Sequence, residues 1–202
     1  PVEKTIEVPR KAAKVSTATV TAEEDDLQYY LNHIVKTRAG ESAVVIDLST
    51  FSATTRETTL VVDQGISIKF TNGTLKRGTG LAEYDPIIRI SNGTIVEFDE
   101  TVTISGENLP TNGEAVVLED ASLKTAAWIG NTYDGMAYYS CIAALSSSSK
   151  LEVLGGTTDL GGIRYLGTEQ PLVISGGKHE WIFSYFSDAV ISGKNTEISS
   201  FT

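Results

Sequence analysis

Ile66-Ser-Ile-Lys-Phe-Thr-Asn-Gly-Thr-Leu75 and Pro86-Ile-Ile-Arg-Ile-Ser-Asn-Gly-Thr-Ile95 repeat one pattern, with Asn72 and Asn92 20 residues apart. In each copy, apolar residues at alternate positions run into an Asn-Gly turn and resume alternation beyond it. This pattern is typical of a strand, a tight turn and a second strand. A repeat of this length predicts stacked coils of chain, not a hairpin alone.

Weaker copies follow the two clear ones. The segment 116–123 aligns with the second copy at an offset of 28, which places Asp120 on Asn92. The segment 148–153 falls on the same frame after a second such offset, and 172–177 and 190–195 are degenerate last copies. A spacing of 20 to 28 residues is that of one solenoid coil, so the sequence predicts parallel strands that pair with the coil below, about 4.8 Å away.

The repeat also predicts the places of particular side chains. Asn72, Asn92 and Asp120 are expected to stack at one corner of the coil, since Asn and Asp tolerate left-handed backbone. Arg77 and Glu97 hold equivalent positions in the two copies and are expected to form a cross-strand pair. The residues expected to face inward are Ile68, Phe70, Leu75, Ile88, Ile90, Ile95, Val116, Leu118 and Leu123.

The chain is expected to divide into three parts. Residues 1–20 mix charges with β-branched residues around Pro9, which favours an arm or edge strand. Residues 21–40 contain a capping box, Thr21-Ala-Glu-Glu24, and apolar residues at helical spacing, which predict a helix from about Ala22 to Arg38. Asp25 and Asp26 are explained there as partners of the helix dipole. The helix would cap residues 41–202, a solenoid of roughly six to seven coils, because an uncovered end strand invites polymerisation.

Composition limits the classes of partner. The net charge is −10, and residues 41–202 hold ten basic and twenty acidic residues. This body should repel phosphates and anionic lipids, so neither nucleic acid nor a membrane surface is expected as a partner. The sequence has no apolar run of membrane-spanning length. It begins at Pro1, which leaves open that the chain is part of a longer protein.

The segments LQYYLNHI, AVVIDLST, TTLVVDQGISIKFTNGTLKRG and IIRISNGTIVEF resemble the opening coils of the pectin-lyase-like superfamily. The similarity is greatest to non-catalytic-looking surface proteins of gut bacteria, and it extends from about Asp25 to Gly106. It implies an all-β fold, a right-handed parallel β-helix with an N-terminal capping α-helix. It also implies an extracellular or cell-surface location. Because this superfamily includes lyases, hydrolases, tailspikes and adhesins, the fold does not specify the activity.

The sequence predicts no catalytic residues, no cofactor and no metal site. Neither the Asp cluster of a hydrolase nor a calcium-binding acidic group with a basic partner is present. Two histidines far apart and one cysteine, Cys141, offer little to a transition metal. An alternative interpretation is a diverged polysaccharide lyase or glycoside hydrolase, whose site would come from Asp134, Arg164, Lys178, His179 and Glu180.

Two aromatic clusters are the candidate ligand-binding residues. They comprise Trp128, Tyr133 and Tyr139 on one stretch, and Trp181 and Tyr185 on another. Aromatic rings beside polar groups could hold a sugar, although the same rings could instead close the C-terminal end of the rod. The sequence therefore favours a structural or adhesive module that binds polysaccharide or a cell-surface protein without catalysis.

Overall fold

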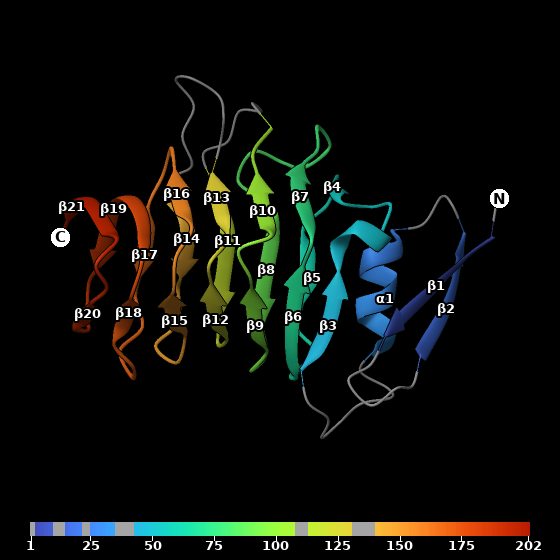
Figure 1. The fold of residues 1–202 in the computed structure, drawn as a ribbon, viewed down its shortest axis with the longest axis horizontal. Coiled ribbons are helices and arrows are strands. Elements are labelled where there is room, and N and C mark those ends of the chain that lie inside the picture. Colours follow the sequence, from blue (N-terminus) through green and yellow to red (C-terminus); the bar gives the residue numbers. More distant parts are fainter. Residues whose placement is uncertain (1–2, 10–14, 22–24, 35–42, 108–112, 131–139) are drawn as a thin grey trace.

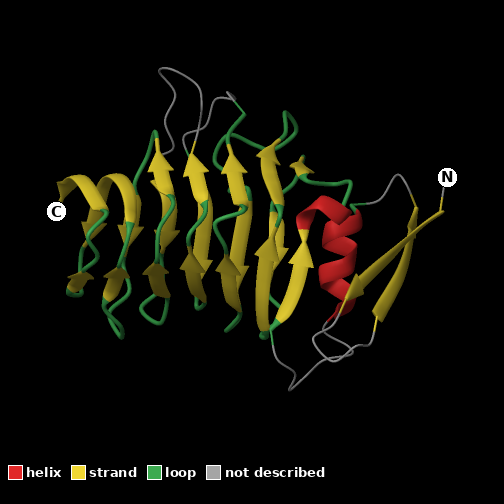
Figure 2. Cartoon of the chain, viewed as in Figure 1, coloured by secondary structure: helices red, strands yellow, loops and turns green. Residues whose placement is uncertain are grey.

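Two large parallel sheets make up most of the molecule in the computed structural model of the chain. The structure describes the chain apart from residues 1–2, 10–14, 22–24, 35–42, 108–112 and 131–139. Corresponding strands of successive coils lie side by side along the long axis (Figure 1), and loops connect the strands of each coil (Figure 2). The fold is a parallel β-helix with one N-terminal helix, as predicted.

The first sheet takes one strand from each of seven coils. Val44 of the first coil pairs with Ile68 of the second, and Ile68 pairs in turn with Val96 of the third. The seven strands are β3 (Val44–Asp47), β6 (Ser67–Thr71), β9 (Ile95–Phe98), β12 (Ser122–Thr125), β15 (Lys150–Val153), β18 (Leu172–Ile174) and β20 (Ala189–Ile191).

The second sheet has twelve strands and covers the other two faces of the coil. One face consists of β4 (Thr55–Arg56), β7 (Gly73–Arg77), β10 (Val102–Ser105), β13 (Trp128–Gly130) and β16 (Thr157–Asp159). The other consists of β5 (Leu60–Val62), β8 (Ile88–Ser91), β11 (Glu114–Glu119), β14 (Ser140–Ala144) and β17 (Ile163–Tyr165). The long strand β19 (Gly177–Ser184) pairs with both β16 and β17 and so joins the faces, and β21 (Thr196–Phe201) pairs with β19.

Alternation along each strand sends every second side chain into the interior, where residues of neighbouring coils stack. The rings of Phe70 and Phe98, for example, lie 5.6 Å apart between centroids. Ile95 is not part of this interior: it is 51% exposed, and its neighbour Val96 is buried. The prediction for Ile95 is wrong because the corner before β9 has one residue more than the corner before β12, which reverses the alternation.

All three corner residues have the predicted backbone, but only Asn92 and Asp120 have the predicted stacking. The φ angles of Asn72, Asn92 and Asp120 are 52°, 58° and 53°, all left-handed. Asn92 and Asp120 share a corner, where the Gly93 N–H donates to the Asp120 carbonyl over 2.7 Å. Asn72 lies between β6 and β7, and its amide donates to Asp47 over 3.1 Å. The repeat that relates Asn72 to Asn92 therefore joins two different corners of one coil, whereas a full coil leads from Asn92 to Asp120.

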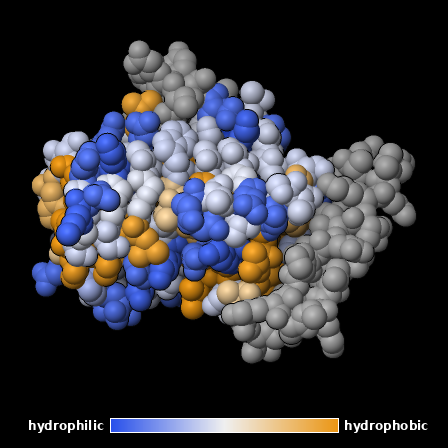
Figure 3. All heavy atoms as spheres, viewed as in Figure 1, coloured by the Kyte–Doolittle hydropathy of each residue, from blue (hydrophilic) through white to orange (hydrophobic). Residues whose placement is uncertain are grey.

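The expected pair of Arg77 and Glu97 is wrong for the same reason, since the two residues lie on different faces. Arg77 is buried and donates to backbone carbonyls of the loop at 81–85. Glu97 accepts from Lys69 of the adjacent strand over 2.7 Å, and this bond raises the pKa of Lys69. Such outward charges belong to a surface that is mostly hydrophilic on the side seen in Figure 3.

The helix α1 (Asp26–Ile34) lies within the predicted range, while 22–24 and 35–38 fall outside the described residues. Asp25 accepts from the Gln28 N–H over 3.0 Å at the start of the helix. The buried apolar face consists of Leu27, Tyr30, Leu31 and Ile34. Beyond the helix, at the N-terminal end of the molecule (Figure 1), β1 (Glu3–Pro9) and β2 (Val15–Thr21) form an antiparallel hairpin.

Polar contacts attach the helix to the first coil. Asp26 accepts from the Ser52 and Ala53 N–H groups over 2.8 and 2.9 Å, and Arg56, 1% exposed, pairs with Asp25. Gln28 pairs with the outer edge of β5: its Nε2 donates to the Val61 carbonyl over 3.0 Å, and its Oε1 accepts from the Val61 N–H over 2.8 Å. The side-chain amide thus takes the place of a neighbouring strand at this edge.

At the other end, the segment 181–202 forms the last coils and does not fold over them as a plug. Ile191 and Phe201 are aligned with the buried Ile174 and Ile182 of the preceding coil. They are nevertheless 46% and 48% exposed.

Gln28→Ala should destabilise the N-terminal end of the rod. The substitution leaves the N–H and C=O of Val61 without their amide partner, so we expect the free energy of unfolding to fall by about 1–3 kcal/mol. Exchange of the Val61 amide proton should also become faster. Denaturant unfolding and hydrogen exchange measure the two effects, with Thr58→Ala, at an exposed position just before β5, as a control expected within about 0.5 kcal/mol of the unsubstituted protein. Equal losses in the two variants would contradict this role of Gln28.

Candidate functional site

Four aromatic side chains follow one another along the end of β19 and into the loop after it. Trp181, Phe183 and Tyr185 alternate in sequence, so strand geometry places them on the same side, and Phe186 comes next. The centroids of successive rings lie 4.9, 6.0 and 6.1 Å apart. We call these four residues the aromatic strip.

The strip is seated at one end and exposed at the other. Trp181 is partly buried and packs on the backbone of Gly162 in the preceding coil, where a Cβ atom would lie 2.3 Å from its ring atom Cδ2. Phe183 is also partly buried and pairs in register with Arg164 of β17. Tyr185 and Phe186, by contrast, are 59% and 68% exposed. Two ring faces are therefore available to a ligand.

A groove of about 780 Å³ begins at this exposed end. It lies between corner loops of two consecutive coils, 166–171 from β17 to β18 and 185–188 from β19 to β20. We call it the corner groove. Its lining residues are Thr168, Glu169, Gln170, Pro171, Tyr185, Phe186, Ser187 and Asp188.

Hydrogen bonds inside the rod fix the two loops. The buried Tyr165 places its hydroxyl 2.9 Å from the Ser149 carbonyl and 2.8 Å from the Gln170 carbonyl. Burial also raises the pKa of Tyr165, so this hydroxyl keeps its proton. The Leu172 N–H donates to the Asp188 carbonyl over 3.1 Å, which ties one loop to the other. The groove is thus built on the stacked interior.

The corner groove carries negative charge. Glu169 and Asp188 are exposed, and no lysine, arginine or histidine is among the lining residues. Within the described part of the chain, neither carboxylate forms an ion pair. Together with the Gln170 amide, they offer hydrogen-bond partners to a ligand seated on the aromatic rings.

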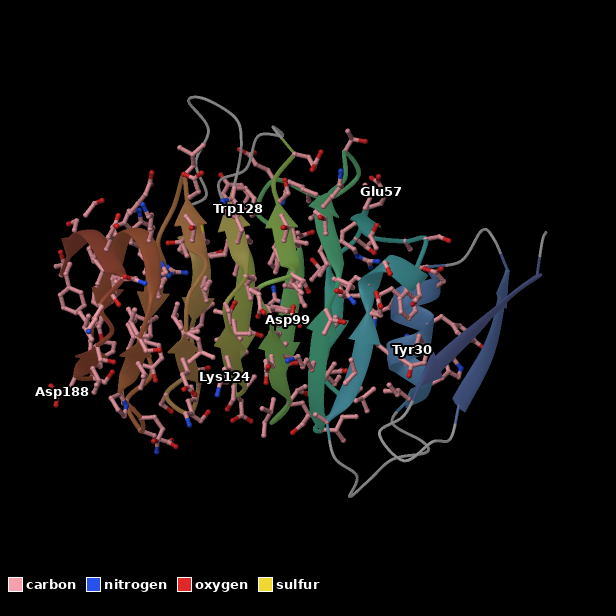
Figure 4. The ribbon with its side chains drawn as sticks, viewed as in Figure 1. Tyr30, Glu57, Asp99, Lys124, Trp128 and Asp188 are labelled. Atoms are coloured by element: carbon pink, nitrogen blue, oxygen red, sulfur yellow. The ribbon has the colours of Figure 1, made fainter. Side chains whose placement is uncertain are left out.

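The structure brings together only some of the predicted ligand-binding residues. Trp181 and Tyr185 both belong to the aromatic strip. Trp128 lies on β13, on another face and two coils earlier, and Figure 4 labels it well away from Asp188 at the C-terminal end. Tyr133 and Tyr139 fall outside the described residues.

The ligand-binding residues chosen from the sequence did not include Phe183, Phe186, Glu169 and Asp188. The alternation of Trp181, Phe183 and Tyr185 is a period-two signal that could have placed these rings on one side. Glu169 and Asp188 had no such signal. They meet only because loops of different coils are stacked, and the register pairs Leu172 with Ala189 of the next coil.

The residues of the enzymatic alternative lie on several parts of the rod. Asp134 is outside the described residues. Arg164 lies on the β17 face and pairs with Glu114, whereas Lys178 lies on the β16 face and pairs with Glu197 over 3.1 Å. Glu180 is exposed and accepts from the Gly161 N–H over 3.1 Å.

His179 points into the interior, in register with Thr158 and Ile198. Its Nε2 lies 3.0 Å from the Gly176 carbonyl, so Nε2 carries the proton and Nδ1 accepts from the Thr158 hydroxyl over 3.2 Å. Burial lowers the pKa of His179.

A second groove, of about 270 Å³, contains His179, Lys178 and Glu180 in its wall. Arg164 is not part of that wall, so the structure brings together three of the four described residues of the alternative set and leaves Arg164 apart.

In the described part of the chain, no group of three or more His, Cys, Asp or Glu side chains is placed so that it could hold a metal ion. Cys141 is buried, and burial raises the pKa of its thiol far above the ordinary value. Its sulfur lies 3.5 Å from the Asp159 carbonyl. A buried, protonated thiol of this kind is a packing residue rather than a nucleophile.

Comparisons with protein-family models, curated proteins and solved structures found no match. Among the described residues, no helix has the length and apolar character needed to cross a membrane.

Tyr165→Phe should loosen the corner groove while the fold is retained. Loss of the hydroxyl leaves the Ser149 and Gln170 carbonyls without this donor, at a cost of about 1–2 kcal/mol. The Thr168 and Glu169 N–H groups, which donate to the Ser147 carbonyl, should then exchange about 5 to 30 times faster. Hydrogen exchange measures this change, and Tyr84→Phe, at an exposed tyrosine, is the control. Unchanged protection at both loop positions would refute it.

Acidification should destabilise the last coils through His179. The pKa of His179 in the folded protein lies below the ordinary value of 6.5. Below about pH 6.5 the unfolded chain therefore binds a proton more readily than the folded protein, and the free energy of unfolding decreases as the pH is lowered. Thermal unfolding at about pH 7.5 and 5.5 measures the loss. His179→Leu should make this loss smaller, and a pH dependence as large as that of the unsubstituted protein would contradict the assignment.

Proposed function

We propose that this chain is a non-catalytic, carbohydrate-binding module of a bacterial surface or secreted protein, with a pectin-lyase-like fold. The observation that supports it is the aromatic strip, whose exposed rings Tyr185 and Phe186 open onto a groove with carboxylate and amide groups. The C–H face of a sugar packs on an aromatic face, while its hydroxyls need polar partners beside the ring. The corner groove supplies both.

The rod contributes rigidity to this function. Each coil pairs with its neighbours along all three faces, so the loops that form the groove are held at fixed spacing. A preformed site of this kind loses little conformational freedom on binding. Such a scaffold suits a structural or adhesive role. A cell-surface protein that carries glycans would bind through the same aromatic strip.

The enzymatic alternative, a diverged polysaccharide lyase or glycoside hydrolase, draws on the second groove, where Lys178 and Glu180 lie near the carboxylates of Asp159 and Glu197. It predicts release of unsaturated products or reducing ends from a panel of polysaccharides. Product formation would favour that alternative over binding without catalysis.

The double variant Tyr185→Ala and Phe186→Ala should lose binding to the best ligand of a polysaccharide panel. Two exposed rings that stack on sugars contribute about 1–2 kcal/mol, so we expect the affinity to fall about 5- to 30-fold. Isothermal titration measures the loss, and circular dichroism checks that the fold is kept. Tyr84→Ala is the matched control, because Tyr84 is 69% exposed but lies in the loop after β7. Unaltered affinity in the double variant would refute the proposed site.

A further inference from the structure

The corner groove carries negative charge beside exposed aromatic rings. On the strands, carboxylates are commonly paired: Glu97 with Lys69, Glu119 with Arg89, and Glu152 with Lys124. Glu169 and Asp188 form no such pair within the described residues. The groove therefore holds two exposed carboxylates without a counter-charge of its own.

The aromatic rings add to the preference for a cation. An ammonium group over the face of Tyr or Phe is attracted by the negative face of the ring, and a nearby carboxylate strengthens the attraction. Tyr185 and Phe186 present exposed rings in the same groove as Glu169 and Asp188. The net charge of −10 adds a long-range field of the same sign.

Neutral and acidic sugars fit this groove less well. A neutral sugar can pack on the rings and donate hydroxyl hydrogen bonds to the carboxylates, but it brings no positive charge to offset theirs. A uronic acid would be repelled by them. A sugar with a free amino group satisfies both features, since it has an apolar face for the rings and an ammonium for the carboxylates.

We propose that the corner groove selects an amino sugar, specifically a polysaccharide unit whose amine is free and protonated. The inference depends on the proposed carbohydrate-binding function and names its ligand class. The sugar face packs on Tyr185 and Phe186, and the ammonium group is held by Glu169 and Asp188.

The test compares three hexasaccharides of equal length by isothermal titration at about pH 6, where the carboxylates are ionised. They are oligomers of glucosamine, N-acetylglucosamine and glucose. We expect the glucosamine hexamer to bind about ten-fold more tightly than the other two. Because the preference is electrostatic, raising the salt concentration from about 0.05 to 0.5 M should remove most of it.

Variants then test the residues. Glu169→Gln and Asp188→Asn should each reduce the preference for the free amine while binding of the neutral hexamers persists. The control is Asp85→Asn, an exposed carboxylate in the loop after β7, which should leave the preference unchanged.

The outcomes separate the two proposals. Equal binding of all three hexamers would overturn the charge selection and leave the carbohydrate function standing. No binding of any hexamer would overturn the amino-sugar proposal, whereas no binding across the polysaccharide panel would overturn both. Preference for the amine that survives both carboxylate substitutions would overturn the assignment to this groove. So would a lysine hexapeptide that binds as tightly as the glucosamine hexamer, because that result would show attraction of charge without recognition of a sugar.

Discussion

The interaction on which the whole molecule depends is the stacking of one coil on the next. A single coil cannot bury its own inward side chains, and the backbone groups of its strands depend on neighbouring coils for partners. Both needs are met only by neighbours, through parallel hydrogen bonds and through contacts such as that between Phe70 and Phe98. Every other feature of the rod, including its corners and loops, takes its position from this stacking.

The two ends of the stack are treated differently. At the N-terminal end, Gln28 satisfies the exposed edge of β5 with its side-chain amide, while Asp25 and Asp26 bind the first coil. A helix has no free backbone groups along its side to offer a strand, so side chains must take over the pairing. At the C-terminal end the described residues include no such cover, and Ile191 and Phe201 are half exposed.

Loops at the corners are where this architecture can carry a function. Strand positions are constrained by stacking on both sides, whereas corner loops can differ in length from one coil to the next. The corner groove illustrates this division. Tyr165 and the bond between Leu172 and Asp188 fix the bases of the loops from the interior, and the exposed tips carry the rings and carboxylates.

The sequence by itself determined the parallel β-helix, the left-handed corners at Asn72, Asn92 and Asp120, and the existence of the helix before the first coil. The stacked coils follow from the repeat of strand and turn at 20 to 28 residues, and the corners and the helix follow from turn chemistry and helical spacing, which are properties of neighbouring residues. Register was decided only by the tertiary structure. One extra residue at a corner moved Ile95 to the surface, and the repeated Asn-Gly turn proved to mark two corners of one coil, so that Arg77 and Glu97 lie on different faces. The corner groove depends on the same level of organisation. Trp181 and Tyr185 could be chosen from their chemistry, and Asp188 follows Tyr185 in the same loop, but Glu169 reaches them only through the pairing of coils, which no local pattern encodes.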